Sequence, residues 1–187
     1  MGLSIHYTGE LINREILVPL IEEVADICQS LEWKFKTIDD DEIKGICFSP
    51  KGSEPVCLTF NEEGRTLSPI NIMVKEIYDG VQLPKDLYFT ASTKTQYAGI
   101  DAHIAIIKLL KYISKKYLAK FTVTDEGYYW ETGDEKLLLE QFEKYNVAVN
   151  TFRKAFENLQ SIPGESPESL GDRIERILRE KLGGKED

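Results

Sequence analysis

The sequence predicts an α+β protein in which an antiparallel sheet has helices packed on one face and further helices follow at the C-terminus. Three observations lead to this fold class. In residues 100–118 the apolar side chains recur at steps of three and four, which is the spacing of a helix. Residues 33–73 instead contain short strand-like segments that are separated by polar turns. The order strand, helix, strand, turn, strand also occurs twice, in residues 3–48 and 87–131.

The composition is that of a globular acidic protein. The chain has 187 residues, of which 42% are hydrophobic and 29% charged, and its formal net charge is -9. This length predicts a single α+β domain over residues 1–159, followed by a linker and a charged amphipathic helix over residues 160–187. The negative charge argues against general nucleic-acid binding. Lysines interrupt the most apolar segment, which argues against a membrane span.

The N-terminus and the cysteines bear on the compartment. Residues 1–9 lack the charged and apolar regions of a signal peptide, so we expect a cytoplasmic protein. Cys28, Cys47 and Cys57 show no CxxC spacing, and we expect them to be reduced, buried thiols. We expect no metal site and no cofactor, because the sequence has neither a His/Cys cluster nor the glycine pattern of a nucleotide-binding loop.

The first half of the chain reads as a strand, a helix and a series of strands. Residues 3–7 are the first strand, and Asn13 is a candidate N-cap for a helix that ends near Leu31. Further strands are expected over residues 33–38, 43–48, 56–60 and 65–73. If the second and third of these form a hairpin, Cys47 lies opposite Cys57 on the neighbouring strand.

The second half reads as two long helices with a hairpin between them. We expect a loop over residues 74–86, a strand over 87–90, the core helix over 100–118 and a hairpin of residues 120–124 and 128–131. Thr132, with Glu135 three residues on, is a capping-box signal for a helix over residues 134–159. After a linker, residues 168–182 form a helix with a narrow apolar stripe, which should dock on the body, on the preceding helix or on a partner chain.

The repeated order of elements suggests two βαββ units. Two such units would join their strands into one antiparallel sheet with both helices on one face. In layout this is similar to the duplicated strand-helix-strand-strand folds, including the gyrase-inhibitor-like domains, which bind small amphipathic molecules between their halves. The resemblance lies in the order of elements and in no motif, and a fold by itself assigns no function.

Five side chains are candidates for ligand binding. Residues 128–131 (Tyr-Tyr-Trp-Glu) are the most concentrated aromatic stretch. Trp130 and Glu131 could form one wall of a pocket for a cationic or amphipathic ligand, with Tyr97 and Trp33 completing it. The alternative for these aromatic residues is ordinary core packing. His103 lies at the edge of an apolar helix face, where it is either a hydrogen-bonded core residue or a ligand-binding residue or general base.

The leading hypothesis is a non-catalytic protein that binds a small amphipathic molecule or a protein segment. One alternative is an enzyme that uses His103 or Glu131 as its acid or base. Another is a structural homo-oligomer. A homodimer could form through the C-terminal helix or through the seven-residue apolar repeat of the long helix. The residues of that repeat are Leu138, Phe142, Tyr145, Val149, Phe152 and Phe156.

Overall fold

A computed structural model describes residues 3–77, 84–157 and 166–182. The chain divides into two compact units, Met1–Phe142 and Glu143–Asp187, each of which we describe by itself. The predicted division after residue 159 stays a prediction. The predicted linker over residues 160–165 and the middle of the predicted loop, residues 78–83, lie outside the described residues.

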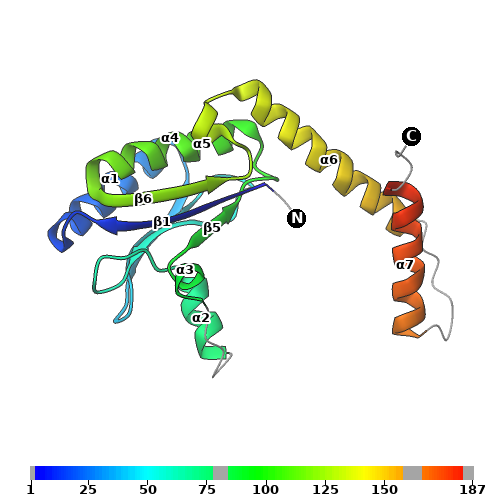
Figure 1. Ribbon diagram of the computed structural model, residues 1–187. Helices are drawn as coiled ribbons and strands as arrows, with labels where there is room; N and C mark the ends of the chain where they lie inside the picture. The colour runs from blue at the N-terminus through cyan, green and yellow to red at the C-terminus, as the bar shows by residue number, and fades with distance from the viewer. Residues whose placement is uncertain (1–2, 78–83, 158–165, 183–187) are drawn as a thin grey trace. The chain divides into compact units, whose positions relative to one another are not determined.

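The first unit combines short strands with helices, which confirms the α+β class (Figure 1). Its elements are β1 (Ser4–Leu11), η1 (Arg14–Ile16), α1 (Leu17–Ser30), β2 (Lys34–Asp39), β3 (Lys44–Ser49), β4 (Val56–Phe60), α2 (Pro69–Ile77), α3 (Lys85–Tyr88), β5 (Ala91–Lys94), α4 (Ile100–Tyr117), β6 (Leu118–Asp125) and α5 (Tyr129–Thr132). The helix α6 (Glu135–Glu157) begins in the first unit and ends in the second. The helix α7 (Pro167–Leu182) belongs to the second unit.

The strands form two antiparallel sheets where we expected one. Each sheet is three-stranded, with the orders β5-β1-β6 and β2-β3-β4. The reason lies after β4: the chain makes only isolated bridges to the neighbouring strands at Arg65 and Thr66 and then enters α2. No ladder therefore joins β4 to the other sheet among the described strands. The predicted duplication stays a prediction.

The helices α1 and α4 lie side by side (Figure 1), although not on one sheet as the repeated order of elements predicted. The helix α1 packs on β2 and β3, and α4 packs on β6. Their apolar stripes are buried at the expected three- and four-residue steps. The fully buried apolar members of these stripes are Leu20, Val24, Cys28, Ile106, Ile107, Leu110 and Ile113.

An ion pair and several hydrogen bonds join α1 to α4 at the surface. The Glu23 carboxylate accepts hydrogen bonds from Lys116 Nζ (2.8 Å and 2.9 Å), from the Tyr112 hydroxyl (2.6 Å) and from the Tyr117 hydroxyl. These bonds, that of Lys116 above all, lower the pKa of Glu23 to about 2. Glu23 therefore stabilises the fold in its ionised form.

The substitution Glu23→Gln should lower the free energy of unfolding at neutral pH by up to about 1 kcal/mol, because partly exposed ion pairs contribute little. A lowered folded-state pKa gives stability that is present above the unfolded value and is lost as the pH falls through the folded value. The difference between wild type and variant should thus shrink between about pH 4.5 and about pH 2. Urea unfolding across this range measures it, with the exposed neighbour Glu22→Gln as control. A difference that does not change with pH would contradict the role of Glu23.

Two segments that we predicted as strands are helices. In the first, Pro69 takes the first position of α2, where its missing N–H is not needed. The Ser68 carbonyl then accepts the N–H groups of Asn71 and Ile72. The second is residues 128–131, which the sequence analysis assigned to a hairpin. There Tyr128 takes a left-handed conformation (φ 59°) and the chain turns into α5.

Other boundaries move by a few residues. The strand predicted over residues 87–90 is β5, a few residues further on, and α3 occupies its place. Asp134 rather than Thr132 caps α6, because its Oδ1 accepts the N–H groups of Lys136 and Leu137 at 2.9 Å and 3.1 Å. No helix within the described ranges is long and apolar enough to cross a membrane.

The seven-residue repeat of α6 is divided between the two units. Leu138 and Phe142 are buried in the first unit, whereas Val149 is exposed in the second. Tyr145 and Phe152 are half-buried, and the side chain of Phe156 lies outside the described part of the chain. The homodimer predicted through this repeat stays a prediction.

Candidate functional site

The β3-β4 hairpin presents two cysteines on its outer face. Ile46 and Phe48 of β3 pair with Leu58 and Val56 of β4, and all four are buried. Because side chains alternate along a strand, the residues between them point to the other face. Cys47 lies directly opposite Cys57 there, with a Cα–Cα distance of 4.1 Å. The register predicted from the sequence is thereby confirmed.

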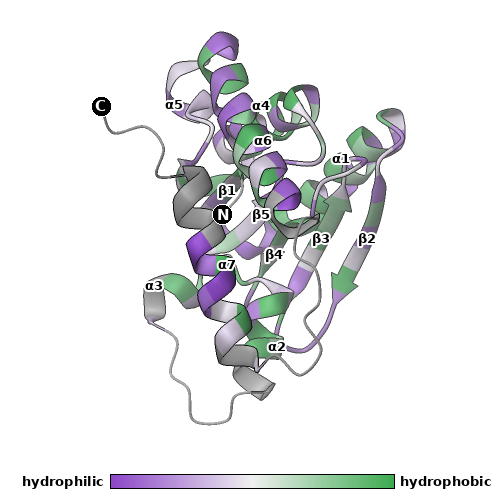
Figure 2. Cartoon of the chain, turned by 90° about the vertical axis from the view of Figure 1, so that its right-hand side faces the viewer, coloured by the Kyte–Doolittle hydropathy of each residue, from purple (hydrophilic) through white to green (hydrophobic). Residues whose placement is uncertain are grey.

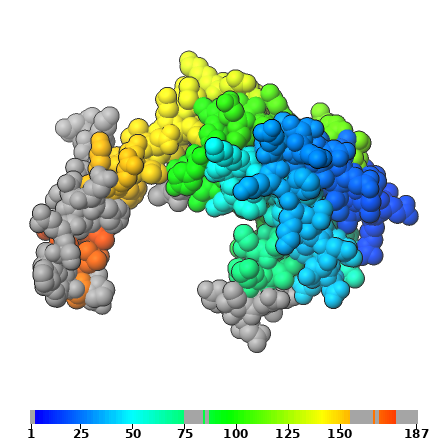
Figure 3. Space-filling view, turned by 180° about the vertical axis from the view of Figure 1, so that it is seen from behind, coloured from blue at the N-terminus to red at the C-terminus, as the bar shows by residue number. Residues whose placement is uncertain are grey.

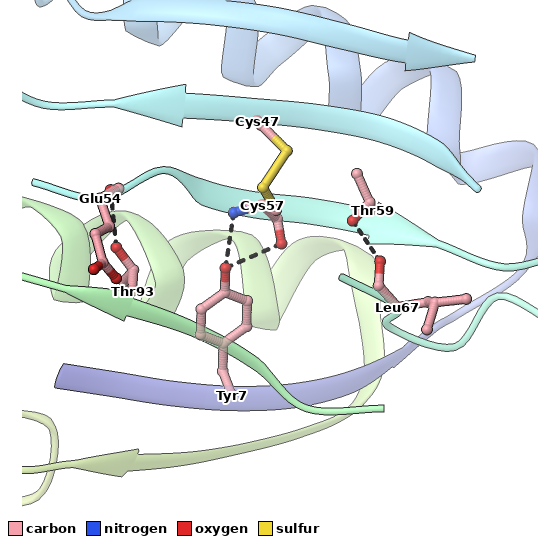
Figure 4. The surroundings of a disulfide bond; sticks show 7 residues. All are labelled: Tyr7, Cys47, Glu54, Cys57, Thr59, Leu67 and Thr93. Carbon is pink, nitrogen blue, oxygen red and sulfur yellow. Dashed lines mark hydrogen bonds between the residues drawn. A yellow bond between two sulfur atoms is a disulfide. The ribbon is translucent and has the colours of Figure 1, made fainter. Parts of the chain in front are cut away.

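A disulfide joins Cys47 to Cys57 (Figure 4). The expectation that these two residues are reduced, buried thiols is therefore wrong. The physical reason is the register itself, which holds the two half-buried side chains opposite each other. Only the third cysteine fits the expectation, since Cys28 is a free thiol with no exposed surface. Burial raises the pKa of the Cys28 thiol to about 11, which keeps it protonated and unreactive.

Tyr7 of β1 joins the two sheets at the disulfide (Figure 4). Its hydroxyl accepts a hydrogen bond from the Cys57 N–H at 2.9 Å and donates one to the Cys57 carbonyl at 3.0 Å. The Tyr7 hydroxyl thus makes the hydrogen bonds to the Cys57 backbone that a neighbouring strand would otherwise make. Burial raises the pKa of Tyr7 far above its usual value, and the bond to the Cys57 backbone lowers it only in part, so the hydroxyl keeps its proton.

Further hydrogen bonds hold the segment around Cys57, and those of Glu54 join it to β5 of the other sheet. Before β4, Glu54 donates its N–H to the Lys94 carbonyl, and its carbonyl accepts from the Thr93 hydroxyl, both at 3.0 Å. The Glu54 carboxylate accepts the Lys94 N–H at 3.0 Å. On β4 itself, the Thr59 hydroxyl donates to the Leu67 carbonyl at 2.6 Å. These bonds fix the strand that carries Cys57 (Figure 4).

An apolar groove of about 510 Å³ lies over the disulfide. It runs across the outer face of the β2-β3-β4 sheet, and the start of α2 forms one wall. Figure 2 shows α2 beside this sheet, and in the space-filling view the residues of α2 adjoin those of the strands (Figure 3). Six of its lining residues are Ile38, Cys47, Pro55, Cys57, Pro69 and Ile70. The polar ones are Glu54, Ser68 and Ser92.

Two smaller hollows are more polar. One, of about 300 Å³, is lined by residues of both charges, among them Arg14, Asp41 and Glu62. The other, of about 320 Å³, lies at β1 and β6, where Glu10 lies 2.8 Å from Lys120 Nζ and 3.9 Å from Arg65 Nε. Both hollows contain charged residues, and those of the second are already paired. The groove over the disulfide is therefore the stronger candidate for a binding site.

His103 is a hydrogen-bonded core residue. Its ring has no exposed surface and packs edge-on against Phe142. Nδ1 lies 2.7 Å from the Thr95 hydroxyl, and Nε2 lies 3.1 Å from Asp125 Oδ1. The structure thus places His103 in the core with a partner at each ring nitrogen. Its role in ligand binding or as a general base stays a prediction.

Asp125 is the centre of this buried cluster. Besides His103, its carboxylate accepts the N–H groups of Gly127 (2.8 Å) and Trp130 (2.9 Å), which turns the chain from β6 into α5. Burial raises the pKa of Asp125, but the bonds from His103 and the two N–H groups outweigh it and hold the pKa below its usual value. The carboxylate therefore supports this turn in its charged form.

Trp130 and Glu131 lie in α5, at the edge of the β5-β1-β6 sheet. The Trp130 ring is half-buried, meets Phe121 of β6 edge-on at 5.8 Å, and has Lys111 Nζ at 5.3 Å from its centroid. The Glu131 side chain is exposed. A cation already lies near the indole ring, where the sequence analysis expected a cationic ligand.

Trp33 and Tyr97 lie elsewhere. Trp33 stacks on Phe48 of the β2-β3-β4 sheet at 5.7 Å, whereas Trp130 packs on Phe121 of the other sheet. Tyr97 is 73% exposed. The structure does not bring Trp33 and Trp130 together, and neither they nor Tyr97, Glu131 and His103 line the groove. Their role in ligand binding stays a prediction.

Sequence reasoning missed most of the groove. Ile38 and Cys47 could have been placed on one face from the strand pattern, since they lie on neighbouring strands of the predicted sheet. The wall that contains Pro69 and Ile70 could not, because those residues were assigned to a strand. Glu54 was passed over because it stood among many acidic residues.

Comparisons with known proteins give no further guide. No protein-family model, no curated protein and no solved structure matches the chain. The function is therefore argued from the geometry of the groove alone.

Proposed function

We propose that the protein binds a small amphipathic molecule in the groove over the Cys47–Cys57 disulfide. The observation that carries this proposal is an open, mainly apolar hollow of about 510 Å³ in the outer face of a sheet. This volume lies within the range of roughly 300–1,000 Å³ that is usual for small-molecule sites. Covering such apolar surface with the body of a ligand would remove it from water, which is favourable.

Glu54 determines the kind of head group. Its Oε2 already accepts the Lys94 N–H at 3.0 Å, and a carboxylate can accept several hydrogen bonds. An ammonium or hydroxyl group at this rim would find that carboxylate together with the hydroxyls of Ser68 and Ser92. A carboxylate head would meet repulsion instead. The ligand class is therefore an apolar body with a cationic or hydrogen-bond-donating head.

Isothermal titration calorimetry with decylammonium and decanoate, both below their micelle concentrations, tests this proposal. We expect one decylammonium per chain, bound with a negative heat-capacity change, and decanoate bound about tenfold more weakly. Glu54→Gln keeps an acceptor for the Lys94 N–H and should reduce this preference to less than about threefold. Equal affinity for the two probes in the wild type would contradict the role of Glu54.

Two tryptophan substitutions locate the ligand. Ile70→Trp places a larger side chain in the groove wall and should weaken decylammonium binding at least about tenfold. Val18→Trp is the matched control, because Val18 is also exposed on a helix but does not line the groove. If both variants bind like the wild type, the ligand lies elsewhere. If no probe binds to the wild type at millimolar concentration, the proposed function is wrong.

A further inference from the structure

The disulfide lies where a molecule in the groove would meet it. Cys47 and Cys57 both line the groove and are half-buried. The free thiol of Cys28 lies in α1 with no exposed surface. A reagent in the groove therefore reaches the sulfurs of the pair and not the third cysteine.

The hairpin does not need this disulfide for its register. The two cysteines are only 10 residues apart in the sequence. The β3-β4 ladder already pairs five residues on each strand, from Lys44 with Phe60 to Phe48 with Val56. A cross-link that closes a short loop removes less chain entropy than one that joins distant segments. We therefore expect the fold to persist when this bond is exchanged for two thiols.

A lysine lies opposite Cys47 on the same face of the sheet. Lys36 of β2 pairs with Cys47, which in turn pairs with Cys57, so the three side chains form a row across the outer face. Opposed side chains on one face have Cβ atoms roughly 5 Å apart. A neighbouring cation favours the thiolate form of a cysteine. Among the residues that line the groove, the charged one is Glu54, in the segment that leads into β4.

We propose that Cys47 and Cys57 form a reversible redox site, which a small dithiol reaches through the groove. The thiolate of the reductant attacks Sγ of Cys57, the S–S bond breaks, and Cys47 leaves as a thiolate beside Lys36. A second thiol group of the reductant attacks the mixed disulfide and releases Cys57 as a thiolate, which takes a proton. The protein gains two electrons, and the reductant becomes a disulfide. Cys57 keeps its backbone bonds to Tyr7 throughout.

Dithiothreitol is the probe for the test. The folded full-length chain is incubated with it, alkylated with N-ethylmaleimide, digested and mapped by mass spectrometry, while near-UV circular dichroism follows the tertiary structure. We expect alkylation of Cys47 and Cys57, none of Cys28, and an unchanged near-UV spectrum. Removing the reductant and adding oxidised glutathione should restore the disulfide. A bond that is reduced only when Cys28 is also alkylated would overturn the proposal, because reduction would then require unfolding.

Two pairs of variants test the route and the leaving group. Lys36→Met should slow reduction roughly threefold or more, because the Cys47 thiolate loses its cation. Lys34→Met is the matched control, since Lys34 pairs with Ser49 on the same face. Ile70→Trp should slow reduction similarly, and Val18→Trp should not. Equal rates of disulfide reduction in all four variants would contradict the proposal that the reductant reaches the pair through the groove.

This redox site does not depend on the proposed ligand. If dithiothreitol reduces the pair in the folded chain and decylammonium does not bind, only the proposed function fails. If decylammonium binds in the groove and the folded chain resists reduction, only the redox site fails.

Discussion

Replacing Asp125 with Ala should lower the free energy of unfolding by about 3–5 kcal/mol. The side chain is fully buried and accepts hydrogen bonds from His103 and from the N–H groups of Gly127 and Trp130. The substitution leaves all three donors without this acceptor in the interior, and each unsatisfied buried group is costly. Urea unfolding followed by tryptophan fluorescence measures the loss, because both tryptophans lie in the first unit.

The matched control is Asp101→Ala, at the exposed start of α4, which should lose no more than about 1 kcal/mol. Asp125→Asn keeps the shape of the side chain and tests its charge. Because the folded-state pKa of Asp125 lies below its usual 3.8, its contribution is present above about pH 4 and is lost as the pH falls further. The difference between wild type and Asp125→Asn should shrink on acidification. A loss in Asp125→Ala no larger than that of Asp101→Ala would show that the cluster does not stabilise the turn.

Tyr7→Phe should lower the free energy of unfolding by about 2–4 kcal/mol. It removes one oxygen atom and leaves both the N–H and the carbonyl of Cys57 without a partner at the line where the two sheets meet. The ring itself stays in place, so the loss reports hydrogen bonding rather than packing. Urea unfolding at neutral pH measures it.

Tyr97→Phe is the control, because the Tyr97 side chain is 73% exposed and should lose less than about 0.5 kcal/mol. Tyr7→Phe should also weaken decylammonium binding, because the strand that carries Cys57 loses its hydrogen bonds to Tyr7. A Tyr7→Phe variant as stable as Tyr97→Phe would mean that water or a shift of the strands satisfies the Cys57 backbone. The sheets would then not depend on Tyr7.

Local patterns in the sequence were sufficient to predict the helices and strands that bury one face. The spacing of apolar residues in α1 and α4 predicted these helices and their buried faces, and the alternation in β3 and β4 predicted the pairing of Cys47 with Cys57. These features depend on periodicity, which a single sequence displays directly. The sequence also placed His103 at the edge of an apolar face, where its burial was one of two alternatives.

Features that depend on contacts between distant segments could not be predicted. Tyr7 and Cys57 are 50 residues apart, and nothing near either residue indicates that a hydroxyl replaces a strand partner. The turn after β6 was missed for a similar reason, because Asp125 determines it through its bonds to Gly127 and Trp130 rather than through the hairpin pattern. The groove depends on such contacts, because its lining includes residues of both sheets and of the start of α2 at Pro69.

The most direct test of the groove as the functional site is a two-dimensional ¹⁵N–¹H NMR titration of the full-length chain with decylammonium. We expect the largest shift changes at residues that line the groove, with Cys47, Cys57, Ile70 and Ser92 among them, and small changes at Trp130 and Tyr97. Changes concentrated at Trp130 and Glu131 instead, with the groove residues unmoved, would contradict this account and would place the ligand at the aromatic stretch.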